Sequence, residues 1–241
     1  MCKTCYMRLR LFSLILLGTG ALPSARAGLI GPSTYLSFTD SPFNPASFSY
    51  FYLENFETHI LSVPGVTASA GNTTTLSGFS GSIIDSVDKD DGTIDGTCFK
   101  AGTNCDSWFS SSGAKGVTWT FNAAVLGSLP TAAGIVWTDG SGLVTFKAYD
   151  KDGNLLGTLT SNTDDGNFFG GTAEDRFFGV TNATGIGKIF LSNEGGGIEM
   201  DHLQFGGTAQ SSVPEPGTVG LAAAGLIGLL LVRRRRMSIP L

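Results

Sequence analysis

Alternation between apolar and polar residues constrains the fold of this chain more than any other feature of its sequence. In the run GVTWTF, Val117, Trp119 and Phe121 share one face of an extended strand, while two threonines occupy the other face. The run LVTFKAYD repeats this pattern with Val144 and Phe146. Helical periodicity is nearly absent. These features predict an all-β fold.

Turn sequences divide the middle of the chain into further short strands. The sequence DKDGN at residues 150–154 is typical of a hairpin turn, and it leads into LLGTLT. RFFGVTN, IGKIFLSN and GIEMDHLQFG complete the series. Short strands separated by turns about every eight to twelve residues are typical of antiparallel β-sandwiches, and they favour a jelly-roll-like sandwich here. We expect residues 28–210 to form one such domain.

The last of these strands changes its apolar phase. Ile198 and Met200 share one face, whereas Leu203 and Phe205 have the parity of Asp201. Because side chains alternate along a strand, this switch requires an inserted residue near Asp201. The sequence therefore predicts a β-bulge at this point, and a bulge re-aims the side chains beside it.

Residues 1–27 have the pattern of a signal peptide for secretion. Lys3, Arg8 and Arg10 form a basic region, LFSLILL is an apolar core, and the small residues of ARA mark a cleavage site before Gly28. A retained N-terminal membrane helix is the alternative, but the apolar run is short for a membrane span. We therefore expect cleavage here and export of the domain that follows.

A second apolar run lies near the C-terminal end. Residues 217–232 carry no charge, and as a helix they would span about 24 Å, slightly less than a hydrocarbon core of ~30 Å. The next four residues are Arg233, Arg234, Arg235 and Arg236, which resist translocation. We predict a short transmembrane helix at 217–232 and a basic cytoplasmic tail at 233–241. This orientation places residues 28–210 outside the cytoplasm.

A linker at residues 211–216 precedes this helix and contains Val213, Pro214, Glu215 and Pro216. With the apolar helix and the arginines, this Val-Pro-Glu-Pro sequence resembles the PEP-CTERM sorting signal. The resemblance implies a Gram-negative bacterium that makes extracellular polysaccharide, and an exosortase that recognises the tail and cleaves near the motif. The protein would then be anchored transiently in the inner membrane before it reaches the cell surface or extracellular matrix. A plain C-terminal anchor behind a Pro-rich linker is the alternative.

The segments FFGVT, IGKIFLSN and GIEMDHLQFG also resemble, in their order, the jelly-roll domains often found ahead of PEP-CTERM tails. Many lectin and carbohydrate-binding modules share that architecture. Because a fold does not fix a function, this similarity makes sugar binding an analogy only.

The exported domain is strongly acidic. Between residues 28 and 210, nineteen acidic residues outnumber seven basic ones, which gives a net charge of −12. Such a surface repels phosphate backbones, so we expect no nucleic acid among the partners. It is compatible with divalent cations, although acidity alone also serves solubility.

The densest acidic segment, DSVDKDDGTIDG, contains Asp85, Asp88, Asp90, Asp91 and Asp95. Calcium prefers about six to eight oxygen ligands, and a Gly-containing loop of aspartates can supply carboxylates and backbone carbonyls. The segment does not match an EF-hand, because no glutamate closes the loop. A calcium site here is one hypothesis, and a solvated acidic loop is the other.

Glu54 and Asp201 form a second hypothesis for a cation site. In many jelly rolls the first and last strands pair near a structural cation, and Asp201 lies at the expected bulge. The alternative is that both are ordinary carboxylates at strand edges.

Two cysteines and two tryptophans provide the remaining candidate residues. Cys98 and Cys105 flank a Gly-Thr-Asn turn, and in an oxidising compartment they are predicted to form a local disulfide. Trp108 and Trp137 are candidates for stacking on a sugar ring, and Trp108 is expected to be the more exposed. Burial in the core of the sandwich is the alternative for both tryptophans.

No sequence pattern singles out a catalytic centre. His59 and His202 lack the spacing of a zinc protease, and there is no G-x-S-x-G sequence. We therefore expect a non-catalytic protein of the cell surface or extracellular matrix, sorted by an exosortase. A calcium-stabilised module that binds extracellular polysaccharide is the alternative. An enzyme that acts on polysaccharide through paired carboxylates is the third hypothesis.

Overall fold

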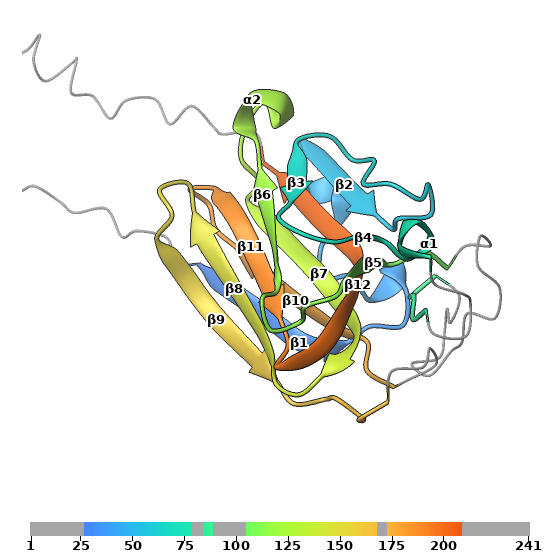
Figure 1. Cartoon of the computed structure of the whole chain (residues 1–241). Coiled ribbons are helices and arrows are strands. Elements are labelled where there is room, and N and C mark those ends of the chain that lie inside the picture. Colours follow the sequence, from blue (N-terminus) through green and yellow to red (C-terminus); the bar gives the residue numbers. More distant parts are fainter. Residues whose placement is uncertain (1–26, 79–83, 89–104, 168–172, 209–241) are drawn as a thin grey trace, which may run out of the picture.

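Two antiparallel β-sheets form the protein, and they stack as separate layers (Figure 1). The computed structural model describes residues 27–78, 84–88, 105–167 and 173–208. Across these ranges the fold is all-β with almost no helix, as the alternating sequence pattern predicts. The predicted signal peptide, sorting segment and membrane helix lie outside the described residues.

The larger sheet contains seven strands. Its order is β1 (Gly28–Thr34), β10 (Arg176–Thr181), β7 (Ala132–Ser141), β12 (Gly195–Gly207), β5 (Trp108–Ser110) and β4 (Asn72–Thr73), with β2 (Tyr50–Glu54) also paired to β12. The long strand β12 pairs with β7 on one side and with both β2 and β5 on the other. It is therefore the central strand of this sheet.

The smaller sheet contains five strands. Its order is β3 (Val66–Ala68), β6 (Val117–Phe121), β11 (Ile186–Ser192), β8 (Val144–Asp150) and β9 (Leu155–Ser161). The helices are single turns: α1 (Thr74–Ser77), α2 (Ala123–Leu126) and the 3-10 helices Phe38–Asp40 and Pro45–Ser47. Within the described ranges, no helix is long and apolar enough to cross a membrane.

The strands read from alternation are confirmed. In β6, Val117, Trp119 and Phe121 are buried, while the intervening threonines are less so. In β8, Val144, Phe146 and Ala148 are buried in the same way. The DKDGN turn joins β8 to β9 in an antiparallel hairpin, where Asp150 and Gly153 close backbone hydrogen bonds. Local sequence pattern therefore determines this part of the fold.

The main core lies between the two sheets and is rich in aromatic residues. Trp119 and Phe146 from the smaller sheet belong to the same buried cluster as Trp137, Phe178 and Phe205 from the larger one. Each of these five side chains is fully buried. Aromatic side chains of this size supply much of the apolar area that stabilises a β-sandwich.

The predicted bulge in β12 is confirmed. The pairing of β12 with β7 shifts register between Glu199 and Met200 and again between Asp201 and Gln204, and His202 has a φ of +44°. Ile198 and Met200 before the bulge, and Leu203 and Phe205 after it, all join the core between the sheets. The polar side chains that alternate with them therefore face the outer side of the larger sheet.

A second apolar cluster covers that outer side. Tyr35, Phe43 and Val87 from loops pack with Val136 of β7 and Phe177 of β10. Residues 84–88 belong to this outer layer, since Val87 is part of the second apolar cluster. Polar residues of β12 are therefore buried between the larger sheet and residues 84–88. This third layer creates the acidic region described next.

Candidate functional site

Acidic side chains are unusually deeply buried in this protein. Eight carboxylates are at most 6 % exposed: Glu54, Asp85, Asp106, Asp139, Glu174, Asp175, Glu199 and Asp201. Burying a carboxylate is costly unless it is hydrogen-bonded, protonated or neutralised by a cation. Among the described residues, no ion pair joins Asp139, Glu174 or Glu199 to a lysine or arginine. Two of these three carboxylates, Asp139 and Glu199, line one cleft.

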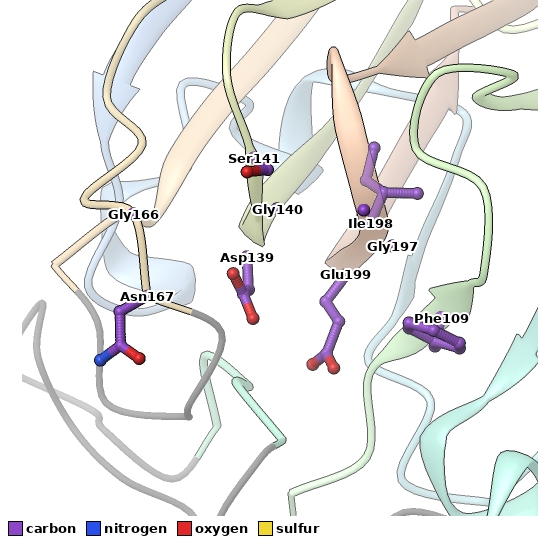
Figure 2. A pocket seen from close by; sticks show the side chains of 10 residues that line it. Phe109, Asp139, Gly140, Ser141, Gly166, Asn167, Gly197, Ile198 and Glu199 are labelled. Carbon is purple, nitrogen blue, oxygen red and sulfur yellow. The ribbon is translucent and has the colours of Figure 1, made fainter.

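A cleft of about 320 Å³ opens at one end of the larger sheet. It is lined by the ends of β7 and β12, by β5 and by a neighbouring loop, through Phe109, Asp139, Gly140, Ser141, Gly166, Asn167, Gly196, Gly197, Ile198 and Glu199. Figure 2 shows the carboxylates of Asp139 and Glu199 projecting into the cleft, between Phe109 on one side and Asn167 on the other. The cleft thus combines an aromatic ring with paired acids.

Backbone pairing brings the two acids together. Glu199 of β12 is the register partner of Asp139 of β7. Side chains at directly opposed positions of an antiparallel pair lie close together, and like charges there are destabilising. The glycines at the start of β12 allow the Phe109 ring to pack closely against the backbone, because a Cβ at Gly197 would lie only 2.5 Å from that ring. The cleft is therefore shaped by β12, whose first residues carry almost no side chains.

One oxygen of the Glu199 carboxylate accepts hydrogen bonds from two neighbouring segments of the chain. Its Oε2 accepts hydrogen bonds from the Asp85 backbone N–H at 2.9 Å and from the Ser107 hydroxyl at 3.0 Å. Burial raises the pKa of the Glu199 carboxyl well above its usual range, and the negative charges of Asp139 and Asp85 add to this. This shift extends the pH range over which the Glu199 carboxyl keeps its proton, and a cation bound beside it would favour the charged form instead.

Asp139 connects Glu199 with a second acidic group beside the cleft, formed by Asp164, Asp165 and Glu174. Burial, with a smaller contribution from the charges of Asp165 and Asp164, raises the pKa of Asp139 to about 7, although a hydrogen bond from the Gly140 N–H opposes the shift. Burial, together with the charges of Asp139, Asp165 and Asp164, likewise raises the pKa of Glu174 to about 9. Four carboxylates therefore influence one another at the edge of the cleft.

A separate acidic group contains two of the residues predicted as cation ligands. Ligand atoms of Asp88, Asp201 and His202 lie within 4.8 Å of one another. Asp201 is engaged by the Ser86 hydroxyl and the Val87 N–H, both at 3.0 Å. The structure therefore brings together Asp88 and Asp201, which the sequence assigned to two different sites.

His202 holds this group together, and the sequence analysis did not select it as a ligand. Its Nε2 lies 3.0 Å from an Asp88 oxygen, and its Nδ1 lies 3.0 Å from the Tyr35 hydroxyl, which also accepts a hydrogen bond from the Gln204 amide at 2.8 Å. The phase switch at Asp201 was the available signal, because the extra residue of the bulge is His202 or its neighbour.

The other predicted cation residues lie elsewhere. Glu54 is buried, and its oxygens accept hydrogen bonds from the N–H groups of Phe56, Ser62 and Val63 and from the Ser62 hydroxyl. It thus holds the loop after β2. Asp85 meets Glu199 through its backbone N–H. Asp90, Asp91 and Asp95 lie outside the described residues.

Neither tryptophan predicted for sugar stacking is at the surface. Trp108 is 7 % exposed and donates from Nε1 to the Ala70 carbonyl at 3.0 Å, and Trp137 is fully buried. The expected exposure of Trp108 is therefore wrong, because its ring packs against Phe56 and Trp119 in the core. The next residue along β5, Phe109, faces the cleft instead.

Of the two cysteines predicted to form a disulfide, Cys105 lies among the described residues, and it is buried and disulfide-bonded. Cys98, its predicted partner, lies outside the described residues. The pairing of these two cysteines stays a prediction.

Comparison with known proteins identifies the C-terminal segment. Residues 212–236 match the PEP-CTERM protein-sorting motif. The chain carries a PEP-CTERM sorting signal. The PEP-CTERM motif supports export and processing by an exosortase, with a cell-surface or extracellular destination. It covers only the end of the chain and describes no property of the β-sandwich.

Comparisons of the rest of the chain add little to the PEP-CTERM match. No curated protein matches the chain. Among solved structures, the C-terminal family 22 carbohydrate-binding module of Clostridium thermocellum Xyn10B is similar at 12% identity. That alignment covers 71% of this chain and 100% of the module, with a TM-score of 0.35.

Proposed function

We propose that this protein is an exported, non-catalytic component of the cell surface or extracellular matrix, sorted by an exosortase through its C-terminal segment. The PEP-CTERM match at residues 212–236 carries this proposal. In a Gram-negative cell, the apolar run at 217–232 would anchor the chain in the inner membrane, and the arginines after it would stay in the cytoplasm. Cleavage near Pro214–Pro216 would then release the β-sandwich outside the cell.

The sorting proposal is tested by following the tail of the full chain. The chain is produced in a Gram-negative host that contains an exosortase and in a matched host that lacks it. Fractionation and intact mass then report where the β-sandwich is recovered and whether it still carries the C-terminal residues. We expect tail removal in the first host only.

Matched variants locate the signal. Replacing Pro214, Glu215 and Pro216 by alanine should leave the tail attached and the protein in the membrane fraction. Ser238→Ala, beyond the arginines, should be processed normally. Equal processing in both hosts, or normal processing of the triple alanine variant, would contradict the proposal.

The cleft favours a second candidate function, the binding of a carbohydrate. Phe109 offers an aromatic ring beside Asp139 and Glu199, in a volume that suits a sugar residue or two. The apolar face of a pyranose packs on such a ring, while carboxylates and amides accept or donate hydrogen bonds to its hydroxyl groups. The extracellular polysaccharide of the producing cell is the ligand that this candidate function implies.

Affinity electrophoresis of the full chain in detergent tests carbohydrate binding. Gels that contain extracellular polysaccharide from a producing strain should retard the wild-type chain. Phe109→Ala should migrate faster than the wild-type chain in those gels and equally in gels without polysaccharide. Phe190→Ala, which removes a partly buried ring from the other sheet, is the matched control. Equal retardation of the wild-type chain and Phe109→Ala would contradict binding in this cleft.

A further inference from the structure

We propose that Asp164, Asp165 and Glu174 form a calcium site at the edge of the cleft, beside Asp139. This site is distinct from the aspartate loop at residues 85–95 and from the pair Glu54 and Asp201, which the sequence suggested. It does not depend on the sorting function, because none of its residues lies in the C-terminal segment.

The geometry of three of the carboxylates suits a single ion. One ligand atom from each of Asp164, Asp165 and Glu174 lies within 4.8 Å of the other two. Calcium holds oxygens at about 2.3–2.6 Å, so ligands on opposite sides of the ion are separated by roughly 5 Å. An ion between these three oxygens would therefore need little rearrangement of the backbone.

An unsatisfied buried oxygen points to a ligand in this group. Glu174 is fully buried; its Oε1 accepts a hydrogen bond from the Asp165 N–H at 2.5 Å, whereas its Oε2 has no hydrogen-bond partner. Asp139 is 6 % exposed, and its Oδ1 also has no partner. Buried polar atoms are rarely left unsatisfied, and a bound ion is one of the few explanations.

The loop between β9 and β10 is arranged to present the remaining oxygens. Asp164 accepts hydrogen bonds from the N–H groups of Gly142 and Gly166, both at 2.6 Å. Asp165 accepts one from the Asn167 N–H at 2.7 Å. These bonds fix the orientation of both carboxylates, and each oxygen keeps a lone pair for a cation.

The local charge favours a divalent ion over a proton. Three carboxylates meet here and a fourth, Asp139, acts on them through its charge, and no ion pair to a lysine or arginine neutralises them within the described part of the chain. Without a cation, burial and mutual repulsion raise the pKa values of Glu174 and Asp139 to about 9 and about 7. A calcium ion would replace those protons and complete its coordination with water, and carboxylate oxygens are its preferred ligands.

The first measurement uses the full chain in detergent, stripped with EDTA and then titrated with calcium chloride at pH 7.5. We expect saturable binding by calorimetry and a rise of several degrees in melting temperature at roughly 100 times the dissociation constant. Magnesium chloride should bind more weakly, because magnesium gives up its water reluctantly. The absence of any calcium effect would overturn the proposal.

Variants assign the ion to these residues. Glu174→Gln should weaken calcium binding by about tenfold or more and remove the calcium-induced rise in melting temperature. Because Glu174 is buried, Asp165→Asn provides a second test at an exposed position, where the fold should be unaffected. Asp152→Asn, in the β8–β9 turn, is the matched exposed control and should bind calcium like the wild type.

A further variant separates this site from the group on β12. Asp88→Asn removes a charge next to His202 and should leave calcium binding intact. If Asp88→Asn abolishes the calcium effect while Glu174→Gln and Asp165→Asn retain it, the ion binds in the other acidic group and the proposal is wrong.

Discussion

Glu199 and Asp139 occupy directly opposed positions on β12 and β7, and both side chains are at least 94 % buried, with exposures of 4 % and 6 %. Opposed like charges destabilise a sheet, and burial strengthens that effect. Natural sequences tolerate such conflicts mainly at sites that bind something. The pair therefore costs stability in the free protein and supplies acidic groups to the cleft.

Glu199→Gln should stabilise the protein in EDTA at pH 8. The new amide keeps an oxygen for the Asp85 N–H and the Ser107 hydroxyl, and its nitrogen can donate toward Asp139, whose Oδ1 has no partner. We expect a gain on the order of 1 kcal/mol in the free energy of unfolding by urea denaturation. Glu194→Gln, at an exposed position, should change stability little. A loss of stability for Glu199→Gln would show that the opposed carboxylates are not in conflict.

Stability in EDTA should fall as the pH rises from about 5 to about 9. The pKa values of Glu174 and Asp139 in the folded protein are about 9 and about 7, against 4.5 and 3.8 for the free groups. Between those values the folded state keeps protons that the unfolded chain has released, so unfolding becomes easier with rising pH. Asp164 and Asp165 face both groups and maintain the shift.

Urea denaturation at pH 5, 7 and 9 measures this dependence. Glu174→Gln should flatten it, because the amide does not titrate. Saturating calcium should flatten it as well, since the ion stabilises the charged form. A stability that rises with pH in EDTA would contradict the raised pKa values.

Local pattern was sufficient for most of the fold and insufficient for the site. The strands β6 and β8 follow from alternation within a few residues, and the bulge follows from one change of phase in β12. Asp139 and Glu174, by contrast, lie in Gly- and Asp-containing turn sequences that resemble ordinary loops. Their proximity depends on the pairing of β7 with β10 and β12, which no local pattern specifies. For the same reason, the burial of Trp108 could not be read from its loop-like surroundings.

Trp137→Ala should destabilise the protein strongly without testing the cleft. The indole is fully buried between the sheets, so its removal leaves a large cavity, which typically costs about 3–5 kcal/mol. Phe109→Ala removes a partly exposed ring and should cost less than half of that. Thermal melts of the two variants test this order. A Trp137→Ala variant as stable as Phe109→Ala would place the indole outside the core.

His202 in the bulge should show a difference between alanine and glycine. His202→Ala removes the contacts to Tyr35 and Asp88 and leaves both groups without that partner, at a cost of about 1–3 kcal/mol. His202→Gly removes the same contacts, but glycine adopts the φ of +44° at little cost, whereas alanine pays roughly 1 kcal/mol for it. We therefore expect His202→Gly to be the more stable variant by urea denaturation. If the two variants are equally stable, or alanine is better, then the backbone at residue 202 does not keep its left-handed conformation once the imidazole contacts are lost, and those contacts hold the bulge in place.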